Sequence, residues 1–541
     1  MRKSGHVPRA AARTPVAAAT TPRWLQALTL LSLPIATFAL YRQALAGAFI
    51  FDDGTAVVHN WAMLFRLWGT LLTSNRPLTN VSYVLNHALG GLSPWGFHLV
   101  NVLVHAANGL LVYVLVRLLL QLPRLGARYG DSHWAALAVS ALFLAHPLQT
   151  EVAAYVASRG DGLAAFFVLG ATIGVALALR WDAAPTWSAA ARAAAAASVL
   201  CGVLSKESGA VAPLLLFLLD WAAVGGRATT VLRRHWMFYS VLGAGWALPA
   251  LIFISHPEYA LSAGFGFSRI MPLQYLYTQP GVILHYLRLV VVPYGQVMDY
   301  DWPLATQLMT PEVLLPGGLV LIALIGTLLA WRRRPLHSLC ALWFFINLAP
   351  TSSVVPIADL IAERRMYLAL LGVLGLLALL VADGAQLARQ RVAREVVSWS
   401  IAAVVGLALA TCAVLTWQRN LLWRSPELMW QDSLAKAPGN PRIHANLGTI
   451  YSQRGQLGPA REHLERALQL IAEGRSVHAT QRHAAMIYTH LASVYLKLGD
   501  TPRARDAYQR ALANGAWKEQ FLRKRLMSLQ GALGAQPPAA K

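Results

Sequence analysis

Residues 366–384 read MYLALLGVLGLLALLVADG, a stretch with one charged side chain, near its end. An apolar segment of this length is long enough to cross the roughly 30 Å hydrocarbon core of a bilayer as a helix. The stretch therefore predicts a membrane-spanning helix, and the fold is sought among membrane proteins.

Comparable apolar segments recur throughout the first 420 residues. The expected spans are 24–44, 97–120, 134–147, 152–180, 190–205, 209–224, 236–255, 313–331, 336–350, 366–384 and 398–417. A further segment, 278–293, either spans the bilayer or is re-entrant. The first apolar run has no convincing cleavage site, so we interpret it as a retained helix rather than a removed signal peptide. The pattern predicts an all-α bundle of about 11 transmembrane helices.

The composition agrees with this interpretation. Of the 541 residues, 56% are hydrophobic and only 13% are charged, against roughly 25% charged in soluble proteins. The net charge of +22 comes from arginines at the ends of apolar runs, where they orient membrane helices. That placement argues against nucleic-acid binding. The three cysteines (Cys201, Cys340 and Cys412) share no metal-ligand or disulfide spacing.

Topology adds a consistency check. If the basic amino terminus lies in the cytoplasm, every cytoplasmic loop is rich in arginine, as the positive-inside rule requires. This topology works only if segment 278–293 begins and ends outside. The opposite face then receives nearly all of the chain's acidic and mixed-charge motifs, and this convergence on one face is unexpected for unrelated structural features.

After residue 420 the chain becomes polar and repeats with a period of about 34 residues, which is typical of tetratricopeptide repeats (TPRs). We expect four regions: a disordered basic cytoplasmic tail (1–22), a transmembrane domain (23–420), an extracytoplasmic TPR domain (421–530) and a flexible tail (531–541). The two full repeats share their offsets: Leu447, Gly448, Tyr451, Ala460, Leu464 and Ala467, then Leu491, Ala492, Tyr495, Ala504, Tyr508 and Ala511.

The strongest candidate for chemistry is the pair Asp52 and Asp53, directly after the first apolar run. Desolvation and mutual repulsion raise the pKa of at least one such carboxyl group, which suits a general base at a membrane face. A solvated loop or a helix cap would give the same pattern.

Basic residues in the same set of loops could bind a phosphate. Arg76 offers a planar fork, and Lys206, followed by Glu207, offers a point charge at a helix end. Interfacial anchoring is the alternative for both. If residues 152–180 form one helix, Arg159 and Asp161 lie about two turns inside it, where ionisable groups usually face a cavity or a partner; a structural Arg–Asp pair is the alternative. The remaining candidates are His146, Glu151, Asp301, Glu363, Arg364 and Tyr367.

The order of these motifs resembles the transmembrane and tetratricopeptide-repeat-containing (TMTC) family, which is related to protein O-mannosyltransferases within the GT-C membrane glycosyltransferases. The resemblance implies a lipid-phosphate-linked sugar donor and inversion at the anomeric carbon. Asp52 would be the base, with Asp53 assisting, and Arg159 and Lys206 would neutralise the departing phosphate. Arg76, Glu363 and Arg364 would shape the donor pocket. The motifs are Phe-Asp-Asp, Arg-Pro-Leu-Thr, His-Pro-x-x-Thr-Glu, Arg-x-Asp, Ser-Lys-Glu, Tyr-Asp-Trp and Glu-Arg-x-x-Tyr.

The sequence departs from the family in its short repeat array and in the residues after Tyr367, where a proline is expected. We expect an inverting transferase that moves one sugar from a polyprenyl phosphate to an extracytoplasmic acceptor, such as a protein hydroxyl or a glycan held by the TPR domain. A non-catalytic TPR scaffold and an oligosaccharide ligase or polymerase are the alternatives.

The Ala- and Arg-rich composition suggests a bacterial inner membrane with the TPR domain in the periplasm. No cofactor motif is present. His146 and Glu151 are too few to define a metal site, so a divalent-metal requirement stays open.

Overall fold

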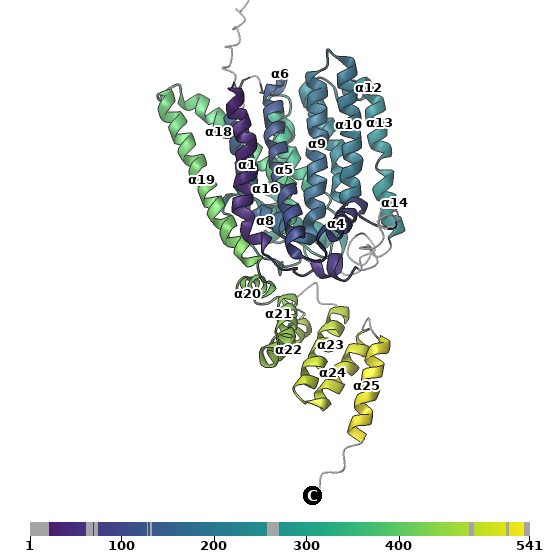
Figure 1. Cartoon of the computed structure of the whole chain (residues 1–541). Coiled ribbons are helices and arrows are strands. Elements are labelled where there is room, and N and C mark those ends of the chain that lie inside the picture. The colour runs from purple at the N-terminus through teal and green to yellow at the C-terminus, as the bar shows by residue number, and fades with distance from the viewer. Residues whose placement is uncertain are drawn as a thin grey trace, which may run out of the picture.

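The computed structural model describes residues 21–60, 69, 74–126, 128–129, 133–256, 264, 270–474, 481–515 and 519–534. Residues 1–20 and 535–541 lie outside this range, so the predicted terminal tails are almost entirely outside the described residues. Two parts follow one another along the chain: a helical bundle and, beyond its last helix, a smaller array of helices (Figure 1).

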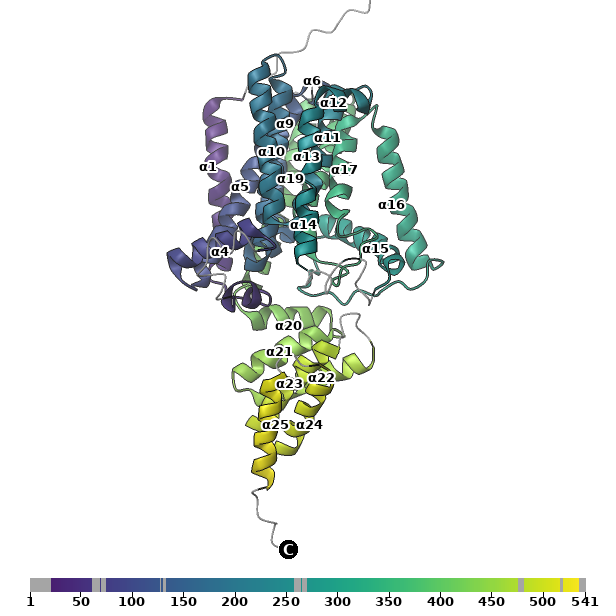
Figure 2. The ribbon, with the colours of Figure 1, turned by 90° about the vertical axis from the view of Figure 1, so that its right-hand side faces the viewer.

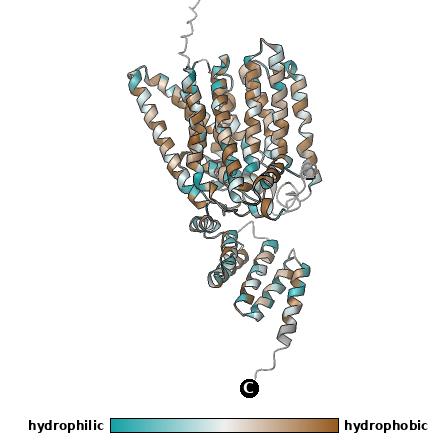
Figure 3. Ribbon diagram, viewed as in Figure 1, coloured by the Kyte–Doolittle hydropathy of each residue, from teal (hydrophilic) through white to brown (hydrophobic). Residues whose placement is uncertain are grey.

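Eight helical segments of the described chain are long and apolar enough to span a membrane. Figure 3 shows hydrophobic residues along the whole length of these helices. The bundle is therefore that of a multi-pass membrane protein. The helices in these segments are α1 (Arg23–Leu45), α5 (Pro94–Gln121), α9 (Arg159–Arg180), α10 (Pro185–Ser205), α11 (Ala212–Val224), α16 (Pro311–Ala330), α18 (Met366–Ala388) and α19 (Arg394–Leu422). The segments of α9, α11 and α18 also include the short 3-10 turn before each helix, so that of α11 spans Glu207–Val224.

The expected number of about eleven spans is not reached, because three apolar segments are short or broken. Helix α7 (His133–Ala145) is followed at a 56° bend by residues 147–154, which end in α8 (Thr150–Ala154). The segment 236–255 divides into α13 (Trp236–Ala244) and α14 (Ala247–Ser255). Helix α17 (Pro335–Leu348) has only 14 residues. Segment 278–293 falls in α15 (Pro272–Val291), which is not among the eight candidate spans.

Small residues allow close packing inside the bundle. A Cβ atom on Gly174 of α9 would lie 2.9 Å from the carbonyl oxygen of Ala191 and 3.0 Å from the Cβ of Ala195, both on α10. Such close approach of backbones is how membrane helices gain van der Waals contact, because lipid provides no hydrophobic drive between them. The α9–α10 pair thereby gives a firm support for the loops at its ends.

Short elements gather at one end of the bundle, which we call the TPR face because the second part of the chain lies against it (Figure 1). They include the π-helical turn η1 (Gly54–Val58), α4 (Pro77–Gly90), α8 and the 3-10 turns η4 (Glu207–Val211) and η6 (Glu363–Arg365).

The TPR part consists of α20 (Pro426–Lys436), α21 (Pro441–Gln453), α22 (Leu457–Ala472), α23 (Gln481–Lys497), α24 (Thr501–Ala513) and α25 (Glu519–Gly534). Its repeat residues form the core, since Ala460, Leu464 and Ala467 are fully buried. A Cβ on Gly448 would lie 2.6 Å from Leu464, which explains the small residue at this repeat position. The all-α architecture, membrane bundle followed by TPRs, is confirmed.

The TPR part is fastened to the bundle by charged and polar contacts. The Arg442 guanidinium of α21 donates to Asp299 (Nε to Oδ2, 2.8 Å) and to Asp359 (Nη2 to Oδ1, 3.0 Å). Lys436 donates to the carbonyl oxygen of Gln296 at 3.0 Å. Figure 2 shows α20 and α21 directly against the TPR face. The first repeat therefore lies next to the loops that carry the polar motifs.

Candidate active site

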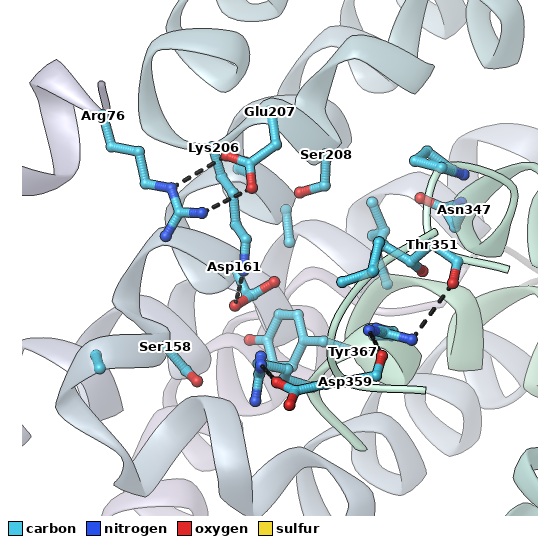
Figure 4. A pocket seen from close by; sticks show the side chains of 18 of the residues that line it. Arg76, Ser158, Asp161, Lys206, Glu207, Ser208, Asn347, Thr351, Asp359 and Tyr367 are labelled. Atoms are coloured by element: carbon cyan, nitrogen blue, oxygen red, sulfur yellow. Dashed lines mark hydrogen bonds and ion pairs between the residues drawn. The ribbon is translucent and has the colours of Figure 1, made fainter. Parts of the chain in front are cut away.

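A cavity of about 580 Å³ lies at the TPR face of the bundle (Figure 4). It is amphipathic. One side is charged, whereas another is formed by apolar side chains of α9, α10 and α18, including Ala164, Val168, Val203 and Leu368. Four acidic and four basic residues line it: Asp52, Asp161, Glu207 and Asp359, and Arg76, Lys206, Arg364 and Arg365.

Asp52 reaches the cavity from a strained loop. Phe51, just before it, has a φ of 50°, which is sterically unfavourable for a residue with a side chain and is most often found at functional sites. The Asp52 backbone N–H donates to the hydroxyl of Tyr155 at 2.9 Å. Asp52 is exposed, and desolvation by the surrounding protein still raises its pKa, although Arg364 opposes the shift.

Asp53 holds this loop in place. It is fully buried, and its two carboxylate oxygens accept the backbone N–H groups of Ile50 (2.9 Å) and Ala157 (2.7 Å). Burial raises the pKa of Asp53 to about 7, against the lowering effect of the two hydrogen bonds. Asp53 does not line the cavity. Its position fits a residue that orients Asp52 rather than the expected partner in catalysis.

Two of the expected phosphate ligands meet at the cavity wall, each in an ion pair. Arg76 makes a bidentate contact with Glu207, with Nε–Oε2 at 3.0 Å and Nη2–Oε1 at 2.7 Å. The Lys206 ammonium donates to Asp161 at 2.6 Å. Burial lowers the pKa of Lys206, and Asp161 opposes that shift. The structure thus brings four of the expected residues to one wall of the cavity: Arg76, Asp161, Lys206 and Glu207.

Arg364 and Arg365 form the other basic group. Arg364 pairs with Glu151 (Nη1–Oε1, 2.8 Å), and its Nη2 lies 3.3 Å from Oδ2 of Asp359. Arg365 donates to the backbone carbonyl oxygens of Thr351, Leu360 and Asp359. In the part of the chain that the structure describes, no carboxylate pairs with Arg365 directly, so its charge is the least neutralised of the four.

Arg159 is the main correction. The structure places it outside the cavity, only 1% exposed, with its guanidinium stacked on Tyr83 at 4.6 Å. Its N–H groups are all directed at neutral protein acceptors, so a lipid phosphate cannot reach them without dismantling these contacts. We therefore assign it a structural role. The acceptors are Asn101 Oδ1, the Ser82 carbonyl and hydroxyl oxygens, Asn86 Oδ1 and the Phe97 carbonyl.

Four other expected residues also lie outside the cavity lining: His146, Glu151, Asp301 and Glu363. His146 is buried and contacts the Val290 carbonyl oxygen and the Leu148 N–H. Glu363 is buried, and its Oε1 accepts the Val297 N–H at 2.9 Å. Asp301 is in the loop between α15 and α16.

Tyr367 does line the cavity, and its hydroxyl contacts His105 Nδ1 at 2.8 Å and Asn108 Nδ2 at 3.0 Å. Glu151 acts on the cavity only through Arg364.

The sequence analysis missed Asp359, Arg365 and Tyr155 as site residues. Arg365 follows Arg364 in the quoted motif, and the turn η6 decides which of the two arginines faces a carboxylate. Asp359 and Tyr155 have no distinctive neighbours in the sequence, so no signal marked them. Within the described ranges, no group of three or more His, Cys, Asp and Glu residues is placed to hold a metal ion.

Comparison with known proteins agrees with the motifs. The tetratricopeptide repeat family model matches residues 441–514. Protein O-mannosyl-transferase TMTC2 from Homo sapiens is 36% identical over 189 residues, which cover 32% of this chain and 21% of the relative. Protein O-mannosyl-transferase TMTC4 from Homo sapiens is 25% identical over 80% of this chain and 64% of the relative. The resemblance to the TMTC proteins is confirmed.

The similarity extends over both parts of the chain. Protein O-mannosyl-transferase F38B6.6 from Caenorhabditis elegans is 24% identical over 82% of this chain and 62% of its own length. The chain thus spans less than two thirds of each of these TMTC relatives.

Two solved structures overlap more loosely. They are the Archaeoglobus fulgidus oligosaccharyltransferase tethered to an acceptor peptide (14% identity, TM-score 0.42, 76% of this chain and 57% of that chain) and ArnT from Cupriavidus metallidurans bound to undecaprenyl phosphate (16%, 0.41, 90% and 80%). Neither overlap is close enough to bear on the function of this chain.

Proposed function

We propose that this membrane protein is an inverting glycosyltransferase that moves a monosaccharide from a polyprenyl-phosphate donor to a hydroxyl group, with a protein hydroxyl as the favoured acceptor. The observation that carries the proposal is the amphipathic cavity. It presents the exposed carboxylate of Asp52 together with a cluster of cations and an apolar wall. A lipid-linked sugar phosphate has the same three parts: a reacting sugar, an anionic phosphate and a hydrocarbon chain.

Asp52 is the proposed general base. It accepts the proton of the acceptor hydroxyl while the oxygen attacks the anomeric carbon from the face opposite the phosphate. The bond between the anomeric carbon and the phosphate oxygen breaks, its electron pair stays on that oxygen, and polyprenyl phosphate leaves. The raised pKa of Asp52 strengthens it as a base, and general-base assistance typically contributes about 10²–10⁴-fold.

Arg365 is the proposed main ligand of the phosphate, and Arg364, which already pairs with Glu151 and Asp359, lies beside it. Negative charge grows on the leaving phosphate in the transition state, and fixed cations in a site with little water stabilise it. Arg365 needs no carboxylate to be displaced, whereas Arg76 and Lys206 must share their charge with Glu207 and Asp161. The last two cations are therefore assigned to the edge of the donor site.

The apolar wall is assigned to the polyprenyl chain, and the TPR domain to the acceptor. The TPR domain lies against the cavity end of the bundle, where a bound peptide would be near Asp52. For the membrane, we propose a bacterial inner membrane with this face in the periplasm, as the composition suggests. No metal is assigned to the reaction, and a divalent-metal requirement is tested by adding a chelator.

The test is sugar transfer by the full chain in lipid nanodiscs, with a panel of polyprenyl-phosphate sugars and hydroxyl-bearing peptides. We expect release of polyprenyl phosphate from one donor and a matching mass increase on the acceptor. Transfer of a whole oligosaccharide from a lipid pyrophosphate would instead favour the ligase alternative. Folded protein that turns over no donor with any acceptor would contradict the proposal.

A further inference from the structure

A second cavity, of about 560 Å³, lies between α16, α17 and α18 and shares no lining residue with the candidate active site. Its walls are almost entirely apolar. Small residues leave the space open, and a Cβ placed on Gly326 would meet no atom within 4 Å. Figure 2 shows α16 standing apart from the rest of the bundle, and only Val313 is buried along that helix. The cavity is thus accessible from the lipid side.

Polar groups are confined to one end of this cavity, the end opposite the TPR face. There, Asp383 of α18 forms ion pairs with Arg334 (Nη1–Oδ2, 2.5 Å), with His337 (3.1 Å) and with Arg128 (Nη2–Oδ1, 2.5 Å), which lies shortly after α6. Both arginines keep contact with solvent, with exposed fractions of 42% and 46%.

The charges do not balance at this end. One carboxylate faces two guanidinium groups, and the exposed Arg332 and Arg333 of the same turn add to the excess. A cation cluster of this kind at a membrane surface attracts anionic lipid headgroups. Simple anchoring of helix ends would explain the arginines, but not an open apolar cavity directly beneath them.

We propose that this cavity binds an anionic phospholipid, whose phosphate contacts Arg128 and Arg334 and whose acyl chain fills the groove beside α16. A soluble anion would find no polar contacts along the apolar walls, and an uncharged lipid would leave the excess positive charge unmatched. The site lies in the leaflet opposite the active cavity and is independent of the proposed transferase activity.

The experiment compares lipids bound to the full chain after incorporation into nanodiscs of phosphatidylcholine and phosphatidylglycerol, using native mass spectrometry. The double variant Arg128→Gln/Arg334→Gln should bind phosphatidylglycerol about 30-fold more weakly, since each arginine near a membrane surface contributes about fivefold. Arg389→Gln/Arg391→Gln is the matched control, because it removes the same charge from exposed residues of the same face.

A second variant tests the groove itself. Gly326→Leu keeps every charge, and leucine favours helix more than glycine does, so the variant should fold. The leucine side chain enters the open space and should displace the acyl chain. Thermal unfolding checks the fold of each variant. Phosphatidylglycerol enrichment that survives both the charge variant and Gly326→Leu would overturn the proposal. Equal loss in the Arg389/Arg391 control, or loss that Gly326→Leu does not reproduce, would also overturn it by showing binding outside the cavity.

Discussion

Replacing Arg442 by alanine should release the TPR domain from the bundle. The guanidinium bridges Asp299 and Asp359, and the side chain of Asp299 is only 8% exposed. Its loss leaves Asp299 with Asn440 as its remaining side-chain partner. Removing one partner of a buried ion pair costs about 3–5 kcal/mol. Because Arg442 itself is 18% exposed, we expect the lower limit, about 3 kcal/mol.

Hydrogen exchange of the docked loop measures this change. The backbone N–H of Met298 donates to the hydroxyl of Ser433 on α20, so it becomes exposed when the TPR domain detaches. A loss of about 3 kcal/mol corresponds to roughly 150-fold faster exchange.

The control removes an exposed ion pair within the TPR domain. Arg454→Ala breaks its contact with Glu427, where the arginine is 48% exposed, and such pairs contribute about 0–1 kcal/mol. Exchange at Met298 should therefore change less than about fivefold. Unchanged exchange in Arg442→Ala would refute the idea that this residue fastens the two parts together.

Three further changes probe the site. Arg365→Gln should lower kcat/KM for the lipid donor about 10- to 100-fold, because a charged hydrogen bond contributes about 1.5–3 kcal/mol. Arg365→Lys should retain part of the lost kcat/KM, because it keeps the charge. Equal kinetics in both variants and wild type would remove Arg365 from the phosphate site. Arg159→Met should lower the unfolding temperature, since its buried acceptors lose their donors, and should leave donor affinity of the folded fraction unchanged; a selective loss of donor affinity would restore the original assignment. Burial raises the pKa of Asp53 from 3.8 to about 7, so the folded state holds this proton more tightly than the unfolded chain, and the contribution of Asp53 to stability should be greatest below about pH 4 and decline up to about pH 7. Comparing unfolding temperatures at pH 5 and pH 8 should show this decline in wild type and its reduction in Asp53→Asn.

Much of the architecture follows from hydropathy and repeat spacing alone. The apolar runs predicted the bundle, and the shared offsets around Leu464 and Tyr508 predicted the TPR helices. The number of membrane spans was harder to predict from the sequence. Hydropathy measures avoidance of water, and it cannot distinguish a span from a broken helix pair such as α13 and α14, or from the bend after α7.

The candidate site was predictable as a set of motifs and less so as a set of contacts. Arg76, Asp161 and Lys206 come together from distant positions as their shared membrane face implied. Arg159 looked like the same kind of residue, because a sequence shows a charge at a helix start without the neutral acceptors around it. Those acceptors lie on other helices, so only the fold reveals that they occupy its guanidinium.

The role of Asp52 tests the account most directly. Single-turnover kinetics with the polyprenyl-phosphate donor would compare wild type, Asp52→Asn and, as a control for the loop, Asp53→Asn, with donor binding measured separately. The account predicts that Asp52→Asn binds donor normally and transfers sugar at least about 100-fold more slowly. It also predicts that Asp53→Asn keeps measurable transfer in the folded protein. Full transfer by Asp52→Asn would contradict the proposed base and the reading of this cavity as an active site built around it.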